Sequence, residues 1–393
     1  MEFTSGHATK PLAHYGKWYH EHGGKDEWAV AKPVEGFDAC PVTTMPENLH
    51  DSMFVGERAA AYISEHANDD QPFFLTASFP DPHHPFNPPL ETALRYKDVP
   101  VKMPVNEDDD LHTRPRHYHY HQYGVWHRAG LLHPLPDMPE EDKEKCGKCA
   151  DQIAQFMDEK ILQGLGLLTH GDSSGEEYKP SVLSAHERDQ RIRNTYAMVD
   201  LIDKGVGKIL DALKESGALE DTVIIFTADH GELMGDHGLW LKGPFFYDGL
   251  VNVPLMMHTP EDNASVTEAL ASSVDIYPTC CELLGVPTPR SCDGMSQAAA
   301  LRGEKVRTEC LFEYRNGYFE NDVYTLGYVD EKYKFVQYQN GDVEMTDRIN
   351  DPEENVNIVY NGANPELLAE YRNKLLNMML NTASKFPEQY CHA

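Results

Sequence analysis

The most informative stretch of the sequence is residues 222–249, TVIIFTADHGELMGDHGLWLKGPFFYDG, because an apolar run here is followed by an acid and an imidazole in a glycine-rich turn. Val223 to Phe226 is a short β-branched and aromatic run with no polar face, which is the pattern of a strand buried on both sides in a parallel sheet. In open α/β sheets, ligands bind just beyond the carboxyl ends of such strands. The sequence therefore predicts a ligand site directly after Phe226.

The residues that follow suit a divalent cation and an anion. Asp229 and His230 offer a carboxylate oxygen and a neutral imidazole nitrogen, which are ordinary ligands for a divalent cation. Lys242, which precedes a Gly-Pro turn, supplies a point positive charge for an anionic group of a substrate. Each residue also has a simpler interpretation, with Asp229 as a helix cap and Lys242 as a solvated turn residue. Their joint spacing favours a metal and anion site.

At these residues the chain resembles the formylglycine-dependent sulfatase family, including its phosphonate monoester hydrolase and choline-sulfatase relatives. The family's strand ends in Thr-Ser/Ala-Asp-His-Gly or Asp-Asn-Gly, and a Gly-Asp-His-Gly-Leu-like turn and a lysine follow it. Residues 227–231 and 235–239 and Lys242 match this pattern. The resemblance implies that Asp229 and His230 are metal ligands and that Lys242 and His237 bind the substrate. It leaves the identity of the divalent metal open among calcium, manganese and zinc.

A second match lies upstream, at residues 72–89, PFFLTASFPDPHHPFNPP, which we interpret as another apolar strand ending in a histidine-bearing loop. His83 resembles the family's substrate-contacting histidine that protonates the leaving group, so it is a second catalytic candidate beside Lys242. Weaker similarity at residues 273–285, 295–303 and 334–357 extends the resemblance to the C-terminus.

Two family motifs are missing from these 393 residues. Family members open with a strand that carries two consecutive aspartates of the metal site, and then a Cys/Ser-x-Pro-x-Arg motif whose first residue becomes the formylglycine nucleophile. Cys40 is followed by Pro-Val-Thr-Thr, with the wrong proline spacing and no arginine, so we do not assign it as a nucleophile. We expect that formylglycine is not encoded in this chain and that its active site is truncated at the N-terminal side.

The fold implied by the resemblance is of the alkaline phosphatase type, a mostly parallel sheet sandwiched by helices. Length and a hydrophobic content of 40% allow one large domain and a small one. We expect an N-terminally incomplete α/β domain over residues 1–304 and an α+β subdomain with short antiparallel strands and a closing helix over residues 305–393.

Several local patterns predict individual elements. Residues 189–216 show apolar side chains at helical spacing and end at Gly217, which is a helix stop signal. Residues 12–23 and 367–380 predict further helices. Asn340-Gly341 between two short apolar runs predicts a hairpin of residues 333–338 and 343–346.

The charge of the chain bears on its partners. It carries 34 basic and 64 acidic residues, a net charge of −30, which argues against nucleic acid or an anionic membrane as a partner. A small anionic ester must therefore be attracted by a local cationic pocket, and this makes Lys242 and the metal more necessary. The sequence has neither an 18-residue apolar run nor a signal peptide at Met1, so we expect a cytoplasmic protein, although a signal lost with a longer N-terminus stays open.

Cysteine and histidine clusters offer weaker candidates. The eight cysteines form no regular framework and look like reduced thiols. Cys146 and Cys149 form a lone C-x-x-C pair. We interpret them as two surface thiols, because a structural zinc site would require a second pair of ligands at similar spacing. His117, His119 and His121 alternate and would share one face if extended, either as a soft-metal cluster or, as we favour, in a polar loop or interface.

Three hypotheses for function remain open. The first is a hydrolase of sulfate or phosphonate esters whose nucleophile segment comes from a second polypeptide or from sequence outside this chain. The second is a repurposed metalloenzyme in which the cation activates water or polarises a carbonyl without a covalent step. The third is a non-catalytic binding or assembly subunit. A homo-oligomer or a complementing N-terminal segment is the expected macromolecular partner.

Overall fold

The computed structural model describes residues 11, 13–106, 113–115, 118, 185–260, 266–315 and 324–383. The chain divides into two compact units, Met1–Pro104 with Gln122–Thr222 and Val105–His121 with Val223–Ala393. The cysteine pair at 146 and 149 and the histidines at 117, 119 and 121 lie outside the described residues. Neither unit ends at residue 304, and the expected division there remains a prediction.

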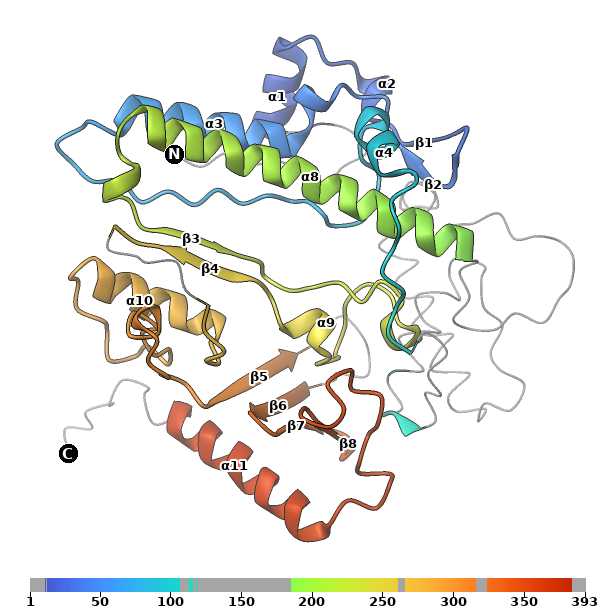
Figure 1. The fold of residues 1–393 in the computed structure, drawn as a ribbon, viewed down its shortest axis with the longest axis vertical. Helices are drawn as coiled ribbons and strands as arrows, with labels where there is room; N and C mark the ends of the chain where they lie inside the picture. Colours follow the sequence, from blue (N-terminus) through green and yellow to red (C-terminus); the bar gives the residue numbers. More distant parts are fainter. Residues whose placement is uncertain are drawn as a thin grey trace, which may run out of the picture. The chain divides into compact units, whose positions relative to one another are not determined.

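The first unit is mainly helical, and two long helices, α3 (Asp51–His66) and α8 (Ala185–Glu215), run side by side (Figure 1). An acid in the first turn of α3 and a histidine in its last turn complement the helix dipole. The other elements described in this unit are α1 (Ala13–Glu21), α2 (Asp26–Ala29), β1 (Lys32–Val34), β2 (Phe37–Val42), η1 (Glu47–Leu49), α4 (Leu90–Tyr96) and η3 (Leu219–Asp221). Strands β1 and β2 pair antiparallel.

Glycines allow α3 and α8 to approach closely. A Cβ added to Gly56 would lie 2.7 Å from both the Cα and the carbonyl oxygen of Gly205, so the two backbones touch at this point. A Cβ on Gly205 would lie 2.5 Å from the Phe79 ring and 2.9 Å from the Ser52 carbonyl oxygen. The segment that leads to His83 therefore packs against the crossing of the two helices.

The helix expected over residues 189–216 is confirmed as α8, and Gly217 ends it with φ of +77°. Two of the apolar residues predicted to face the core of α8 do not do so, because Val199 is 47% exposed and Leu210 is 39% exposed. Small residues such as Ala197 and Gly205 take buried positions at the close packing with α3. Helix α1 confirms the helix expected over residues 12–23.

The strand expected after Pro72 is not formed. Residues 72–80 have no regular secondary structure and no strand pairing among the described residues, and Phe74 is 78% exposed. An apolar run becomes a strand only when a neighbouring backbone pairs with it, which composition alone does not reveal.

In the second unit, β3 (Ile224–Thr227) pairs antiparallel with β4 (Leu255–His258). The strand predicted at residues 223–226 therefore exists, but its burial on both faces within a parallel sheet is wrong for the described residues. A two-stranded ribbon leaves Ile224, Ile225 and Phe226 only half-buried. The segments that follow are η4 (Asp236–Gly238), α9 (Asp248–Val251), η5 (Ser273–Asp275), α10 (Ile276–Leu283) and η6 (Ala300–Arg302).

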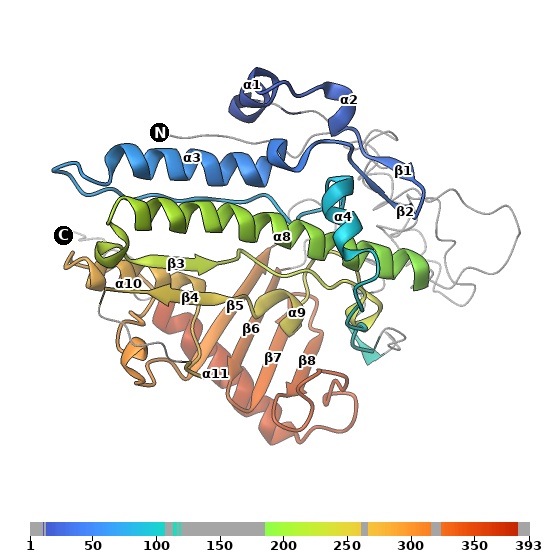
Figure 2. The same ribbon diagram turned by 45° about the horizontal axis from the view of Figure 1, so that its top comes forward.

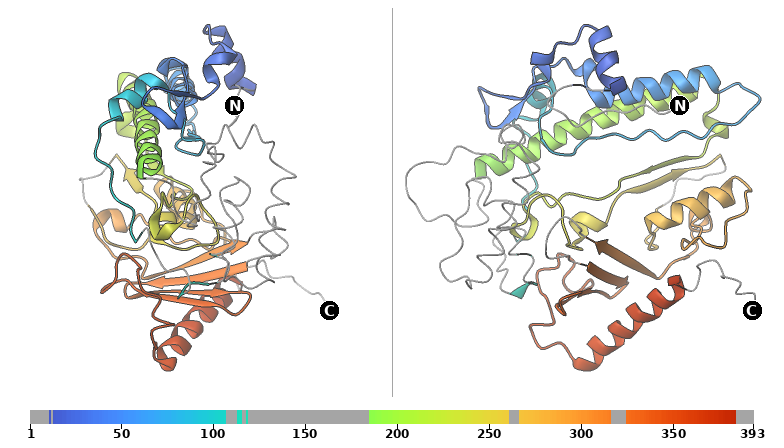
Figure 3. Two further views of the ribbon diagram at one scale, coloured as in Figure 1. Left: turned by 90° about the vertical axis from the view of Figure 1, so that its right-hand side faces the viewer. Right: turned by 180° about the vertical axis from the view of Figure 1, so that it is seen from behind.

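A four-stranded antiparallel sheet forms the C-terminal part of this unit (Figure 2). Its strands lie in the order β5 (Glu309–Arg315), β6 (Tyr324–Asp330), β7 (Tyr333–Tyr338) and β8 (Val343–Asp347). The expected hairpin is confirmed as β7 and β8, with Gly341 at φ of +95° in the turn. Helix α11 (Pro365–Ala383) lies against one face of the sheet (Figure 3), which confirms the closing helix. Its side chains Tyr371 and Leu375 pack against residues of the sheet. Every helix in the described ranges is too short or too polar to span a membrane.

We predict that Gly56→Ala destabilises the first unit by about 1–3 kcal/mol, because the new Cβ meets backbone atoms that cannot yield. This net loss of unfolding free energy already includes the stabilisation of up to about 1 kcal/mol that alanine gives over glycine in a helix interior. Gly207→Ala, on α8 with open space around its Cβ, is the matched control and should stabilise the helix slightly. Urea unfolding followed by circular dichroism compares them, and equal midpoints would refute the close crossing.

Candidate metal and anion site

The turn after β3 is fixed by a close backbone approach. The Gly231 amide donates to the Leu250 carbonyl at 2.8 Å, and a Cβ on Gly231 would lie 1.9 Å from the Gly249 carbonyl oxygen. Only glycine fits at this position. The end of β3 is thereby tied to α9, and Asp229 and His230 directly precede the contact.

The polar groups of this turn converge on His230. Its Nδ1 lies 2.7 Å from the Gly231 carbonyl, and because a carbonyl only accepts, Nδ1 carries the proton. Its Nε2 lies 2.9 Å from Lys242 Nζ and 3.6 Å from Asp229 Oδ2. An ammonium only donates, so Nε2 presents its lone pair toward Lys242. The structure therefore brings together three of the residues that the sequence predicted for the site.

This donor set fits a divalent cation. Metal–ligand distances of roughly 2.0–2.6 Å place two ligands of one ion about 3–4 Å apart, and the 3.6 Å between Asp229 Oδ2 and His230 Nε2 falls in this range. The side chain of Asp229 is 87% exposed and that of His230 is 38% exposed, so the pair is open to further ligands. Two ligands alone bind a metal weakly, and the assignment as metal ligands remains a prediction.

One carboxyl group beside Lys242 was missed by the sequence reasoning. Burial raises the pKa of Glu232 to about 7. Hydrogen bonds from the amides of Met234 and Leu241 and the positive charge of Lys242 act in the opposite direction. The sequence shows this glutamate directly after His230-Gly231, but a single acidic residue at that position does not reveal that its side chain is buried.

The segment between His230 and Lys242 is held in a strained conformation. Met234, His237 and Leu241 adopt positive φ values of 51°, 55° and 63°, which cost of order 1 kcal/mol or more each for residues with a Cβ. Backbone contacts to Val105 stabilise the turn. The Val105 amide donates to Asp236 Oδ1 at 2.7 Å, and the His237 amide donates to the Val105 carbonyl at 2.7 Å. Such strain is typical of ligand-binding turns.

His237 is only 3% exposed, and its ring stacks on Tyr247 with centroids 4.0 Å apart and planes 9° apart. This packing helps to fix the turn that carries Lys242. The substrate-binding role expected for His237 remains a prediction, and the observed geometry is that of a positioning side chain.

A buried ammonium ties the segment after Lys242 to the C-terminal sheet. Lys334 Nζ donates to the Phe246 carbonyl at 2.7 Å, contacts the Asp248 carboxylate, and lies 2.7 Å from Glu354 Oε1. Glu354 Oε2 in turn accepts from the Asp248 amide at 2.7 Å. Lys334 and Glu354 are almost fully buried, so their charges are screened little by water.

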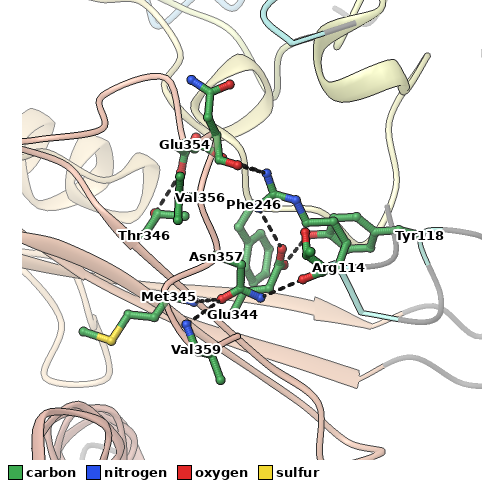
Figure 4. A network of polar contacts seen from close by, with 12 residues as sticks. Arg114, Tyr118, Phe246, Glu344, Met345, Thr346, Glu354, Val356, Asn357 and Val359 are labelled. Atoms are coloured by element: carbon green, nitrogen blue, oxygen red, sulfur yellow. Dashed lines mark hydrogen bonds and ion pairs between the residues drawn. The ribbon is translucent and has the colours of Figure 1, made fainter. Parts of the chain in front are cut away.

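A second buried network lies next to this one (Figure 4). The Arg114 guanidinium donates to the Glu354 and Asn355 carbonyls at 3.0 and 2.9 Å and lies near the Glu344 carboxylate. Glu344 accepts hydrogen bonds from the hydroxyls of Tyr118 and Tyr338. Burial raises the pKa of Glu344 despite these donors. The network connects Arg114 and Tyr118 to β7 and β8 within the same unit.

His83 belongs to the first unit, and its expected role as the histidine that protonates the leaving group remains a prediction. Its Nδ1 lies 2.5 Å from the His84 carbonyl oxygen, so Nδ1 is protonated and Nε2 is the atom that exchanges a proton. The two rings stack with centroids 4.0 Å apart. In the same unit Cys40 is buried, and burial raises the pKa of its thiol to about 11, which agrees with rejecting it as a nucleophile.

The sulfatase family model matches residues 14–286, and the model of the C-terminal region of N-sulphoglucosamine sulphohydrolase matches residues 235–381. The chain belongs to the sulfatase family. This confirms the resemblance carried by the residues around Asp229 and Lys242.

Individual relatives agree with this assignment. The multifunctional alkaline phosphatase superfamily protein PehA of Trinickia caryophylli is 27% identical over 88% of this chain and 62% of its own length. The uncharacterized sulfatase YidJ of Escherichia coli is 24% identical over 86% of this chain and 56% of its own length. The chain thus spans less than two thirds of either relative.

Solved structures show the fold. The phosphonate monoester hydrolase of Silicibacter pomeroyi superposes with a TM-score of 0.69 at 18% identity, covering 94% of this chain and 69% of that one. The enzyme of Agrobacterium radiobacter gives 0.64 at 22% identity with the same coverage. The family fold of the alkaline phosphatase type is therefore confirmed, although the described strands of this chain pair antiparallel.

We predict that Lys334→Met destabilises the second unit by about 3–5 kcal/mol, because it leaves the Glu354 carboxylate buried without its cation. Lys332→Met, two residues away on an exposed side chain, should change the free energy of unfolding by less than about 0.5 kcal/mol. Chemical denaturation of both variants measures the difference. A Lys334 variant as stable as the Lys332 variant would show that the buried ammonium contributes nothing.

Proposed function

We propose that this chain provides the metal-binding and anion-binding part of a metal-dependent hydrolase that acts on a sulfate or phosphonate ester. The observation that carries the proposal is the convergence of a carboxylate, an imidazole and an ammonium on one point of the turn after β3. The names of its relatives, among them an arylsulfatase of Clostridium perfringens and a choline-sulfatase of Rhizobium meliloti, support the same class of reaction.

The residues have distinct tasks in this proposal. Asp229 and the lone pair of His230 Nε2 would hold the cation, and the Nδ1 bond to the Gly231 carbonyl fixes the tautomer that this requires. When bound, the cation supplies Lewis-acid stabilisation of negative charge on the ester oxygens. Lys242 Nζ would contact a non-bridging oxygen, exchanging its hydrogen bond to His230 for one to the anion.

His83 would act as the general acid. A proton on Nε2 passes to the leaving alcohol oxygen, and the ring remains protonated at Nδ1, where the His84 carbonyl accepts. The proton therefore has a defined donor atom, and the neutral product form of the ring keeps its hydrogen bond.

The local cations must act against the field of the whole chain. With a net charge of −30, the molecule repels anions at long range, so attraction depends on short-range contacts with Lys242 and the metal. Substrate capture should therefore depend steeply on the bound cation. A small ester is favoured over a polyanion for the same reason.

We predict feeble hydrolysis of a chromogenic sulfate or phosphonate monoester by this chain, because its 393 residues contain no Cys/Ser-x-Pro-x-Arg motif. The rate should require an added divalent transition metal. Asp229→Ala should abolish it, a larger loss than the roughly 10–100-fold caused by removing an outer-shell partner of a metal site.

The control is Asp211→Ala, which removes an exposed acid on α8 and should leave the rate unchanged. Assays compare metal-stripped and metal-loaded protein. Fast hydrolysis without metal, or equal rates for the Asp229 variant and the parent, would place the chemistry elsewhere. Undetectable hydrolysis together with metal binding would favour the binding subunit over the enzyme.

A further inference from the structure

The loop that carries His83 has a buried anchor at Asp81. The His83 amide donates to the Pro80 carbonyl at 3.2 Å, so Asp81 lies inside the turn that His83 closes. The side chain of Asp81 is only 6% exposed. Its carboxylate accepts the Ser52 hydroxyl at 2.5 Å, and its Oδ2 lies 3.4 Å from His50 Nδ1. Rotation of this turn would therefore break contacts that are shielded from water.

Both anchoring partners belong to the start of α3. His50 Nδ1 also lies 3.0 Å from Asp51 Oδ1, and at 3.4 Å from the Ser52 amide nitrogen. One ring nitrogen cannot donate to carboxylates and accept from an amide at once. The shorter contact to Asp51 and the second carboxylate of Asp81 favour a protonated Nδ1 that donates. The amide contact at 3.4 Å is then only a close approach.

Charge explains why the imidazole stays protonated. Burial opposes the charged form of His50, yet the carboxylates of Asp81 and Asp51 outweigh it and raise its pKa to about 9. Glu47 of η1 acts in the same direction. Burial raises the pKa of Asp81 to about 7, against the attraction of His50. Tyr15 of α1, whose pKa is raised by burial and then by Asp51, stays neutral and adds no charge.

The pKa shift of His50 determines how the stability of the fold depends on pH. A histidine whose pKa is raised by folding stabilises the fold below its ordinary value near 6.5, and this contribution is lost as pH rises through about 9. This contribution also needs the charged form of Asp81, and because burial raises the pKa of that carboxyl, protonation of Asp81 at lower pH weakens the ion pair.

The anchor also rests on rigid packing. The Ser52 carbonyl and the Phe79 ring both lie against Gly205 of α8, where the two long helices cross. Phe79 immediately precedes the Pro80 turn. The backbone before the loop and the helix that supplies His50 and Ser52 are therefore held at the same place.

We propose that His50 and Ser52 are positioning residues for His83, holding its turn through Asp81 without touching the substrate. The catalytic consequence rests on the proposed role of His83 as the general acid. The positional claim does not, because it concerns only the loop and α3.

Imidazole NMR of protein with labelled histidine tests the proposal without any substrate. The His83 signal is assigned by its loss in His83→Gln. In the parent protein the chemical shift of His83 should change as pH rises through about 9, when His50 loses its proton. His50→Gln should remove this shift, and Ser52→Ala should broaden or displace the signal. His66→Gln, at the other end of α3, is the matched control and should leave the His83 signal unchanged.

Hydrogen exchange gives a second readout. Loss of a hydrogen bond to a charged partner should raise the exchange rate of the His83 amide, which donates to the Pro80 carbonyl, by roughly tenfold or more in both anchor variants. If His50→Gln fails to fold, Ser52→Ala decides alone. An unchanged His83 signal with unchanged exchange in a folded Ser52→Ala protein would overturn the proposal. Because neither readout needs turnover, an inactive parent protein would count against the proposed function and leave this test intact.

Discussion

The second unit depends on one buried ammonium, that of Lys334. It satisfies two carboxylates and a carbonyl from segments that are far apart in the sequence, and so joins residues 246–248 and Glu354 to strand β7. An unpaired charge of this kind is costly in the interior, so all of its partners must be present together. The turn with Asp229 and Lys242 directly precedes these contacts in the chain, and it contains three left-handed non-glycine residues, a conformation that persists only where the surrounding structure holds it.

The site itself combines exposure with local rigidity. Asp229 and His230 are open to solvent, as a site that takes a cation and a substrate must be, whereas the groups that orient them are backbone atoms and buried rings. His230 is held by the Gly231 carbonyl, and Lys242 lies within hydrogen-bonding distance of the same ring. The chain belongs to a family of sulfatases, and the geometry independently places a carboxylate, an imidazole and an ammonium close together in this turn.

Sequence reasoning succeeded where the signal is local. Helix α8, the hairpin of β7 and β8 and helix α11 follow from periodicity and turn residues that are near one another in the chain. It failed where the outcome depends on distant partners. The run after Pro72 looked like a strand but pairs with no strand in the described part of the chain. Strand β3 was expected to be buried on both faces but is half-buried beside an antiparallel β4. Local sequence patterns also could not predict the tertiary contacts that bury Glu232, surround Lys334 and hold Asp81.

The most direct test of the central claim is the position of a bound metal. Crystals of this chain soaked with Mn²⁺ would locate the ion by anomalous scattering. We expect a peak within roughly 2.0–2.6 Å of both an Asp229 carboxylate oxygen and His230 Nε2, and we expect no such peak in Asp229→Ala. A peak only at His50, Asp51 and Asp81, which also lie close enough together to share an ion, or no peak near Asp229 at a saturating metal concentration, would contradict it.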